Sequence, residues 1–211
     1  MSREKALEAI KILKKEYPKT KYYLDFSSPL ELLVAAILSA QCRDEVVNSV
    51  TKNLFKKYKT ARDYANAKGL ENDIKSITFF KNKARNIKEA CRVIAEKYNG
   101  RVPDIIEELT QLPGIGRKTA NAILINAFDK IVGIVVDTHV IRLSQRLGWT
   151  KEKNPDKIEK DLMDLIPKQD WRIITYLLKD HGRAVCRAPV PTCSQCKLRN
   201  LCPKIGVTKK L

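Results

Sequence analysis

The sequence has few acidic residues for its size and no long apolar run. Twenty-four Asp and Glu stand against 41 Lys and Arg, which gives a formal net charge of +17 at pH 7. The most apolar stretch, from Leu32 to Ala40, is far shorter than the roughly 20 residues that cross a bilayer. No basic, apolar leader precedes the charged N-terminal segment. These absences predict a cytoplasmic protein without a membrane span.

The excess of positive charge is uneven along the chain. Between His181 and Leu211 seven residues are basic and none is acidic. Strong positive charge attracts polyanions, and nucleic acid is the commonest polyanion inside a cell. Charge alone leaves two interpretations open, which are nucleic-acid binding and a lysine-rich surface that keeps the protein soluble.

Apolar residues recur at helical spacing along nearly the whole chain. Ser28, Pro29 and Glu31 form the pattern of a capping box, and the apolar stretch that follows predicts a helix buried in the centre of a domain. Ile131–Val136 is the best strand candidate, but it has no second strand to pair with. The sequence therefore predicts an all-α fold. Further helices are expected at 7–17, 46–55, 83–98, 104–110, 117–128, 135–147, 155–166 and 170–179.

Two glycines and a proline separate two of the expected helices. Pro113 ends the first helix, while Gly114 and Gly116 permit backbone angles and close approaches that a side chain would prevent. Amides at the start of the second helix then point outward, where the helix dipole favours an anion such as a DNA phosphate. An ordinary turn between helices fits the same residues. A nucleotide-binding P-loop does not fit, because Arg117 separates Gly116 from Lys118.

Lys118 falls in the first turn of the second of these helices. The positive end of the helix disfavours the ammonium form of a lysine there, and a neutral amine can attack an electrophilic carbon. Asp137 follows an apolar run at the edge of buried structure, where a carboxylate usually has a specific task. The simpler interpretations are a lysine that contacts phosphate and an aspartate that caps the next helix.

Four of the six cysteines crowd together near the C-terminus with the spacing C-x6-C-x2-C-x5-C: Cys186, Cys193, Cys196 and Cys202. Without a secretion signal, this arrangement favours metal ligation over disulfides. A zinc ribbon normally has two C-x2-C pairs and this segment has one, so the spacing favours a [4Fe–4S] cluster while leaving zinc open. Cys42 and Cys91 are isolated and are expected to be small core residues.

These motifs resemble the endonuclease III branch of the helix-hairpin-helix DNA glycosylases. The similarity runs from about Pro29 to Pro203 and includes the segments LSAQ, which ends at Gln41, and VDTH around Asp137. The resemblance implies a base-excision repair enzyme that removes oxidised pyrimidines from double-stranded DNA and nicks the abasic site by β-elimination. It also implies a [4Fe–4S] cluster on the four C-terminal cysteines.

The resemblance also assigns roles to individual residues. Lys118 matches the lysine that displaces the damaged base by attack on the sugar C1′, and Asp137 matches the aspartate that assists it across a cleft. Gln41 and Phe79 match two loop residues that enter the duplex, although relatives have leucine at the position of Phe79. The remaining residues expected to contact DNA are Leu112, Gly114, Gly116, Arg117 and Arg187.

An architecture of two helical lobes follows from the same resemblance. Residues 22–132 are expected to form the lobe with the hairpin, and residues 1–21 plus 133–211 the lobe with the cluster. We expect a monomer that binds DNA and is associated with the nucleoid in a prokaryote. Two other functions stay open. One is a monofunctional adenine or mismatch glycosylase, against which Lys118 argues, and the other is a non-enzymatic iron–sulfur DNA-binding protein.

Overall fold

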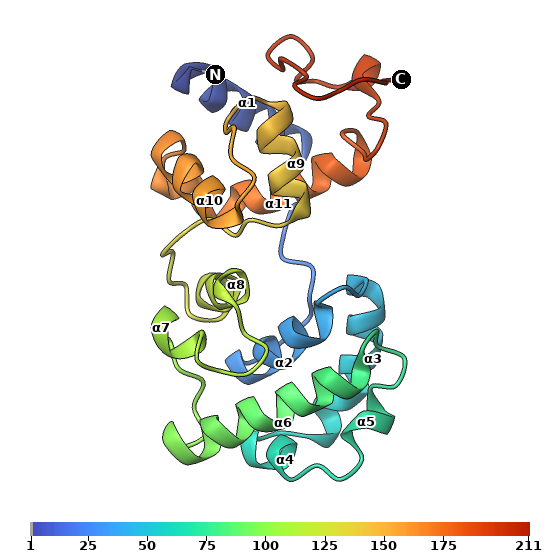
Figure 1. The fold of residues 1–211 in the computed structure, drawn as a ribbon, viewed down its shortest axis with the longest axis vertical. Helices are drawn as coiled ribbons and strands as arrows, with labels where there is room; N and C mark the ends of the chain where they lie inside the picture. Colours follow the sequence, from blue (N-terminus) through green and yellow to red (C-terminus); the bar gives the residue numbers. More distant parts are fainter. Residues whose placement is uncertain (1) are drawn as a thin grey trace. The chain divides into compact units, whose positions relative to one another are not determined.

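Two compact units make up the protein in a computed structural model that describes residues 2–211 (Figure 1). Unit 1 joins both ends of the chain, up to Tyr22 and from Ile131 onward, and unit 2 is the continuous segment Tyr23–Lys130. The described residues form helices, turns and irregular segments with no strand, so the all-α prediction is confirmed. None of their helices is both long and apolar enough to cross a membrane.

Unit 2 is organised around one buried helix. Residues Leu32–Leu38 of this helix, α2, are all buried, as the apolar stretch predicts. Helices α3, α6 and α8 contact α2, while α4 packs on α6 and α7 on α8. The helices of unit 2 are α2 (Pro29–Ser39), α3 (Asp44–Lys57), α4 (Ala61–Ala65), α5 (Leu70–Asp73), α6 (Phe80–Lys97), α7 (Ile106–Leu109) and α8 (Arg117–Ala127).

The predicted capping box of α2 is present only in part. The Ser28 hydroxyl accepts a hydrogen bond from the backbone N–H of Glu31 at 3.2 Å, as a capping serine does. The Glu31 carboxylate, however, accepts from the backbone and hydroxyl of Ser27 rather than from Ser28, both at 2.7 Å. The reciprocal bond is therefore shifted by one residue, and the start of α2 is still held on both sides.

Unit 1 packs four longer helices around a single core, in which α11 contacts α9 and α1. Buried side chains from all four helices share this core, including Ile10, Val140, Ile158 and Leu177. Full burial of such aliphatic side chains stabilises a fold by about 1.5–3 kcal/mol each. The elements are α1 (Arg3–Glu16), α9 (Thr138–Arg146), α10 (Pro155–Leu165), η1 (Lys168–Asp170), α11 (Trp171–Ala184) and η2 (Cys193–Gln195).

The segment Ile131–Val136 is neither a strand nor the beginning of a helix. Helix α9 begins only at Thr138, so the predicted start at Val135 is wrong. Val135 and Val136 are buried in an irregular segment, and the hydroxyl of Thr175 donates to the carbonyl of Val135 at 2.8 Å. A side chain from α11 thus satisfies a backbone acceptor that a helix or sheet would otherwise have to satisfy.

Candidate DNA-binding and catalytic site

A tight loop, Thr110–Gly116, joins α7 to α8 and forms the hairpin (Figure 1). Leu112 and Ile115 are buried beneath it, and the amide of Ile115 donates to the carbonyl of Leu112 at 3.1 Å. Gly114 has φ +82°, and a Cβ there would lie 3.0–3.3 Å from the side chain of Asn86 in α6. Position 114 therefore requires glycine both for its backbone angle and for a close approach to α6.

Gly116 differs from what the sequence suggests. Its φ of −92° and ψ of 173° suit any residue, and a Cβ there would meet nothing within 4 Å. The expectation that a side chain is sterically excluded by the chain itself is therefore wrong at this position. Gly116 is the N-cap of α8, and as a glycine it has no side chain that could accept a hydrogen bond from the first amides of that helix. The first turn is left open to an external acceptor.

Lys118 lies in the first turn of α8, one residue after Arg117. Both side chains are exposed. Lys118 makes no side-chain hydrogen bond or ion pair within unit 2. An exposed amine beside a helix N-terminus of this kind can be approached by an anionic substrate.

Gln41 and Phe79 both have left-handed backbones, with φ of 53° and 57°. Gln41 follows the end of α2 and is exposed, and Phe79 is the N-cap of α6 with 59% of its surface exposed. Non-glycine residues rarely adopt this conformation, and it concentrates at functional loops. Phe79 is one of the few large apolar side chains on the surface of unit 2, which suits a group that inserts between bases.

In unit 1, Asp137 caps α9. Its Oδ1 accepts hydrogen bonds from the amides of His139 and Val140, both at 2.8 Å. Asp137 is therefore a helix cap, as the simpler of the two interpretations of the sequence predicts. The side chain is half-buried, and both hydrogen bonds found for it among the described residues of unit 1 are to Oδ1, which leaves Oδ2 without one there. One oxygen of the carboxylate positions the group while the other remains available.

Helix α9 lies close against α11 because position 182 has no side chain. A Cβ at Gly182 would lie 2.5 Å from Nδ1 of His139 and 2.8 Å from Nη2 of Arg142. The same Nη2 donates to the carbonyl of Gly182 at 3.2 Å, and Nε of Arg142 donates to the carbonyl of Cys186, also at 3.2 Å. Burial lowers the pKa of His139. These contacts fix the helix that Asp137 begins.

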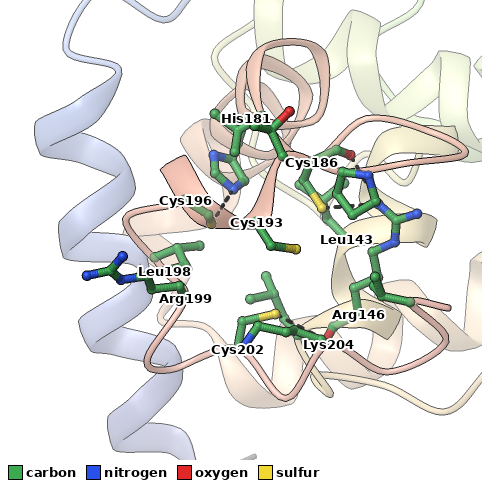
Figure 2. Close-up of a pocket in the computed structure, with 15 residues that line it drawn as sticks. Leu143, Arg146, His181, Cys186, Cys193, Cys196, Leu198, Arg199, Cys202 and Lys204 are labelled. Atoms are coloured by element: carbon green, nitrogen blue, oxygen red, sulfur yellow. Dashed lines mark hydrogen bonds between the residues drawn. The ribbon is translucent and has the colours of Figure 1, made fainter. Parts of the chain in front are cut away.

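All four C-terminal cysteines line one pocket of unit 1, as Figure 2 shows. They are free thiols, with no disulfide among them. Burial raises the pKa of Cys196 to about 11 and also raises that of Cys202. Such thiols are protonated at pH 7 in the bare chain, and a bound cation would favour their thiolate forms. No three His, Cys, Asp or Glu side chains among residues 2–211 are grouped for a single metal ion.

Nitrogen donors lie beside two of these sulfurs. Nη1 of Arg146 is 3.3 Å from Sγ of Cys186, and Nε2 of His181 is 3.4 Å from Sγ of Cys196 (Figure 2). Burial lowers the pKa of His181 to about 4, so its ring is neutral at pH 7. The hydroxyl of Tyr17, 2.9 Å from Nδ1, can donate to that ring nitrogen and leave the Nε2 proton for the sulfur. Four sulfur ligands, with N–H groups placed to donate hydrogen bonds to two of them, therefore suit a metal ion or cluster that is bound by thiolates.

Arg142 and Arg146 connect α9 to the cysteine segment, a role that no sequence motif predicts. Arg146 donates to the carbonyls of Cys186, Arg187 and Pro189 at 2.9–3.3 Å. The i, i+4 spacing of the two arginines on one helix face is the only signal that could have indicated them. The side chain of Arg187 is exposed, and its Nε donates to the carbonyls of Arg183 and Ala184 at the end of α11.

The fold and the hairpin define the class of protein. A family model described as HhH-GPD superfamily base excision DNA repair protein matches residues 34–168, which is more than half of the chain. The matched region includes the hairpin, Lys118 and Asp137. The protein is thus a helix-hairpin-helix DNA glycosylase of base-excision repair.

Relatives place the chain more narrowly. Endonuclease III from Synechocystis is 51% identical over 95% of this chain and 93% of its own, and that from Escherichia coli K12 is 38% identical over 96% of both. The solved structure of a trapped endonuclease III–DNA covalent intermediate has 42% identity and a TM-score of 0.92 over 97% of both chains. A thermostable thymine-DNA glycosylase, at 24% identity and TM-score 0.86 over 95% and 96%, shares the fold. The chain belongs to the endonuclease III family.

Proposed function

We propose that this chain removes oxidised pyrimidines from duplex DNA and then nicks the abasic strand, with Lys118 as the nucleophile. Nζ of Lys118 attacks C1′ of the damaged nucleotide, the C1′–N bond breaks, and the base leaves with a proton. The C1′–O4′ bond then breaks, O4′ takes the remaining amine proton, and a Schiff base forms between Nζ and C1′. This Schiff base acidifies the C2′ hydrogens, and loss of one of them expels the 3′ phosphate. The observation that most supports this proposal is the exposed amine of Lys118 in the first turn of α8. This turn directly follows the hairpin, and its N-cap, a glycine, has no side chain to bind the first amides.

Asp137 has the role of an assisting carboxylate in this proposal. Family membership supports the role, and its free Oδ2 is suited to stabilise a cationic sugar or to accept a proton. Gln41 and Phe79 are proposed to fill the space that the extruded nucleotide leaves. Because one chain supplies every proposed catalytic residue, a monomer suffices. The domain boundaries expected from the sequence assign the hairpin and the cysteines to separate lobes, and we retain that division as part of the proposal.

Strand cleavage on defined duplexes tests the proposed function. We expect the wild-type protein to release an oxidised pyrimidine and nick the strand on its 3′ side. An undamaged duplex, a G·T mismatch and an adenine mispair should remain intact under the same conditions. Release of a base from either mispair without nicking would contradict the proposal and indicate a monofunctional glycosylase.

The two hairpin glycines give opposite predictions. Gly114→Ala should destabilise the protein by about 1 kcal/mol or more, because the residue has positive φ and contacts Asn86. Gly116→Ser should leave the free energy of unfolding unchanged or raise it by a few tenths of a kcal/mol, since serine is a good N-cap. Its hydroxyl would nevertheless occupy the amides that the phosphate needs, weakening binding to abasic duplex about tenfold, or roughly 1.4 kcal/mol.

Chemical denaturation and fluorescence anisotropy measure the two effects separately. A Gly116→Ser protein that is as stable as wild type and binds abasic duplex equally well would show that the N-terminus of α8 holds no phosphate. Loss of stability in Gly116→Ser would contradict the backbone angles and open space found at this position.

We propose that Cys186, Cys193, Cys196 and Cys202 hold a [4Fe–4S] cluster. The donor set supports it, since four free cysteines line one pocket with N–H groups beside two sulfurs. The spacing has a single C-x2-C pair, which zinc ribbons normally double. When bound, the cluster would crosslink the basic C-terminal segment, so that Arg187 and its neighbours are held as one surface for the phosphate backbone.

Metal analysis tests the cluster. We expect equal amounts of iron and acid-labile sulfide in protein purified without oxygen, and little zinc. Cys202→Ser should lose the iron and lower the thermal midpoint by at least about 5 °C, because metal binding contributes folding free energy. Cys42→Ser, outside the segment, should keep the iron. Stoichiometric zinc with no sulfide would overturn the assignment.

A further inference from the structure

Lys83 is a buried cation without an acidic partner. It lies in the first turn of α6 with 5% of its surface exposed. Its Nζ donates to the carbonyl of Leu38 at 2.8 Å and to that of Ala40 at 2.5 Å. Burial lowers its pKa. In the part of the chain that the structure describes, no carboxylate pairs with it. Burying such a group is costly, so its two contacts must do something that an apolar side chain would not.

The first effect of Lys83 is to complete the C-terminus of α2. The last carbonyls of a helix have no partner within it, and α2 has no basic residue in its last turn. The Ser39 hydroxyl donates to the carbonyl of Ala36, and the amide of Cys42 donates to that of Ser39. Lys83 supplies bonds to two further carbonyls, those of Leu38 and Ala40, and places its charge at the negative end of the helix dipole.

The second effect concerns two loops at once. Gln41, with φ 53°, directly follows the carbonyl of Ala40 that Lys83 holds. The backbone amide of Lys83 donates to the carbonyl of Phe79 at 3.1 Å, and Phe79 has φ 57°. Lys83 therefore makes hydrogen bonds to the backbone at both places, directly before Gln41 and at Phe79, which are the two residues with left-handed backbone angles. One turn further along α6, the side chain of Asn86 occupies the space beside Gly114 of the hairpin, where an added Cβ would lie 3.0–3.3 Å from it.

We propose that Lys83 is a positioning residue that sets the spacing of Gln41 and Phe79 so that both can enter the duplex together. The inference rests on the proposed function, in which these two side chains fill the space left by the extruded nucleotide. Lys83 itself touches no DNA in this proposal. Its contribution is preorganisation: without it, the end of α2 and the start of α6 no longer share a fixed anchor.

A purely structural role for Lys83 makes a different prediction. If Lys83 only completes the end of α2, Lys83→Met leaves the carbonyls of Leu38 and Ala40 without this donor and lowers stability. The cleavage rates on duplex and single-stranded substrates should then change by the same factor. If Lys83 positions the two loops, the same variant loses the distortion of duplex DNA while the chemistry of Lys118 is preserved.

The test compares three proteins on two substrates. Lys83→Met removes both hydrogen bonds, Lys83→Gln keeps a donor too short to reach both carbonyls, and Lys97→Met changes an exposed lysine at the other end of α6. One substrate is a duplex with an oxidised pyrimidine and 2-aminopurine opposite the lesion. The other is a single-stranded abasic oligonucleotide, which requires no insertion. Readouts are 2-aminopurine fluorescence at saturating protein and the rates of cleavage.

We expect both Lys83 variants to cut the duplex on the order of 10- to 100-fold more slowly, with a smaller rise in 2-aminopurine fluorescence. Single-stranded cleavage should stay within about twofold of wild type, and Lys97→Met should match wild type throughout. Wild-type behaviour of Lys83→Met on the duplex, equal losses on both substrates, or failure of both variants to fold would each overturn the inference. Failure of the proposed function would differ, because the wild-type protein would then cleave neither substrate.

Discussion

Lys118→Gln is expected to abolish base release and strand cleavage while leaving the protein folded and able to bind damaged duplex. Loss of a covalent nucleophile lowers the rate by at least about a thousandfold, because its contribution cannot be replaced by binding. Glutamine keeps the polarity of the side chain and is one bond shorter, but it has no basic amine. Since Lys118 is exposed and makes no hydrogen bond within unit 2, its replacement removes no contact that stabilises this unit.

Single-turnover cleavage with excess protein isolates this chemical defect from product release. Lys97→Gln is the matched control, since it removes another exposed lysine from unit 2 and should cleave at the wild-type rate. Residual cleavage in Lys118→Gln within tenfold of wild type would mean that another amine or an activated water performs the reaction. Unchanged anisotropy with abasic duplex would show that the variant still binds.

Asp137→Asn should separate the two roles of that residue. Asparagine is as good an N-cap as aspartate, so its amide oxygen can accept from His139 and Val140 and α9 should remain intact. The negative charge is lost, and the rate of base release should fall by about 10²- to 10⁴-fold, the usual contribution of a positioned acid or base. Asp137→Ala should lose the same activity and also about 1 kcal/mol of stability.

Asn154→Ala provides the control for capping. Asn154 caps α10 in the same unit by accepting from the amides of Asp156 and Lys157. Its replacement should cost about 1 kcal/mol of stability and leave activity unchanged. Thermal denaturation and single-turnover rates on one set of proteins decide the question. Wild-type activity of Asp137→Asn would mean that Asp137 only caps α9 and that its charge takes no part in base release.

Local sequence patterns predicted most helices, because their signals lie within a few residues. The apolar stretch after Ser28 predicted a buried helix, and α2 is that helix. At the start of α4, Thr60 forms a complete capping box with Asp63, three residues further along the chain. The signal for the hairpin likewise lies in adjacent residues of the sequence, and Gly114 has the positive φ that glycine permits.

Features that depend on distant residues could not be predicted. Val135 and Val136 have the apolar character of a strand or buried helix, and only the hydroxyl of Thr175 in α11 explains why they form neither. Lys83 lies on the buried face of α6, where the helical pattern leads us to expect an apolar residue and not a lysine. The carbonyls that it holds are 43 and 45 residues earlier in the chain. The open space at Gly116 likewise depends on what the fold leaves beside it.

In the proposed mechanism, the amine of Lys118 becomes covalently bonded to the sugar of a damaged nucleotide. The most direct test is borohydride reduction during reaction with a duplex that carries one oxidised pyrimidine, followed by protease digestion and mass spectrometry of the crosslinked peptide. We expect a single DNA-modified residue, Lys118, in the wild-type protein and no crosslinked peptide from Lys118→Gln. A crosslink at another lysine, or no crosslink from a protein that still releases the base, would contradict it.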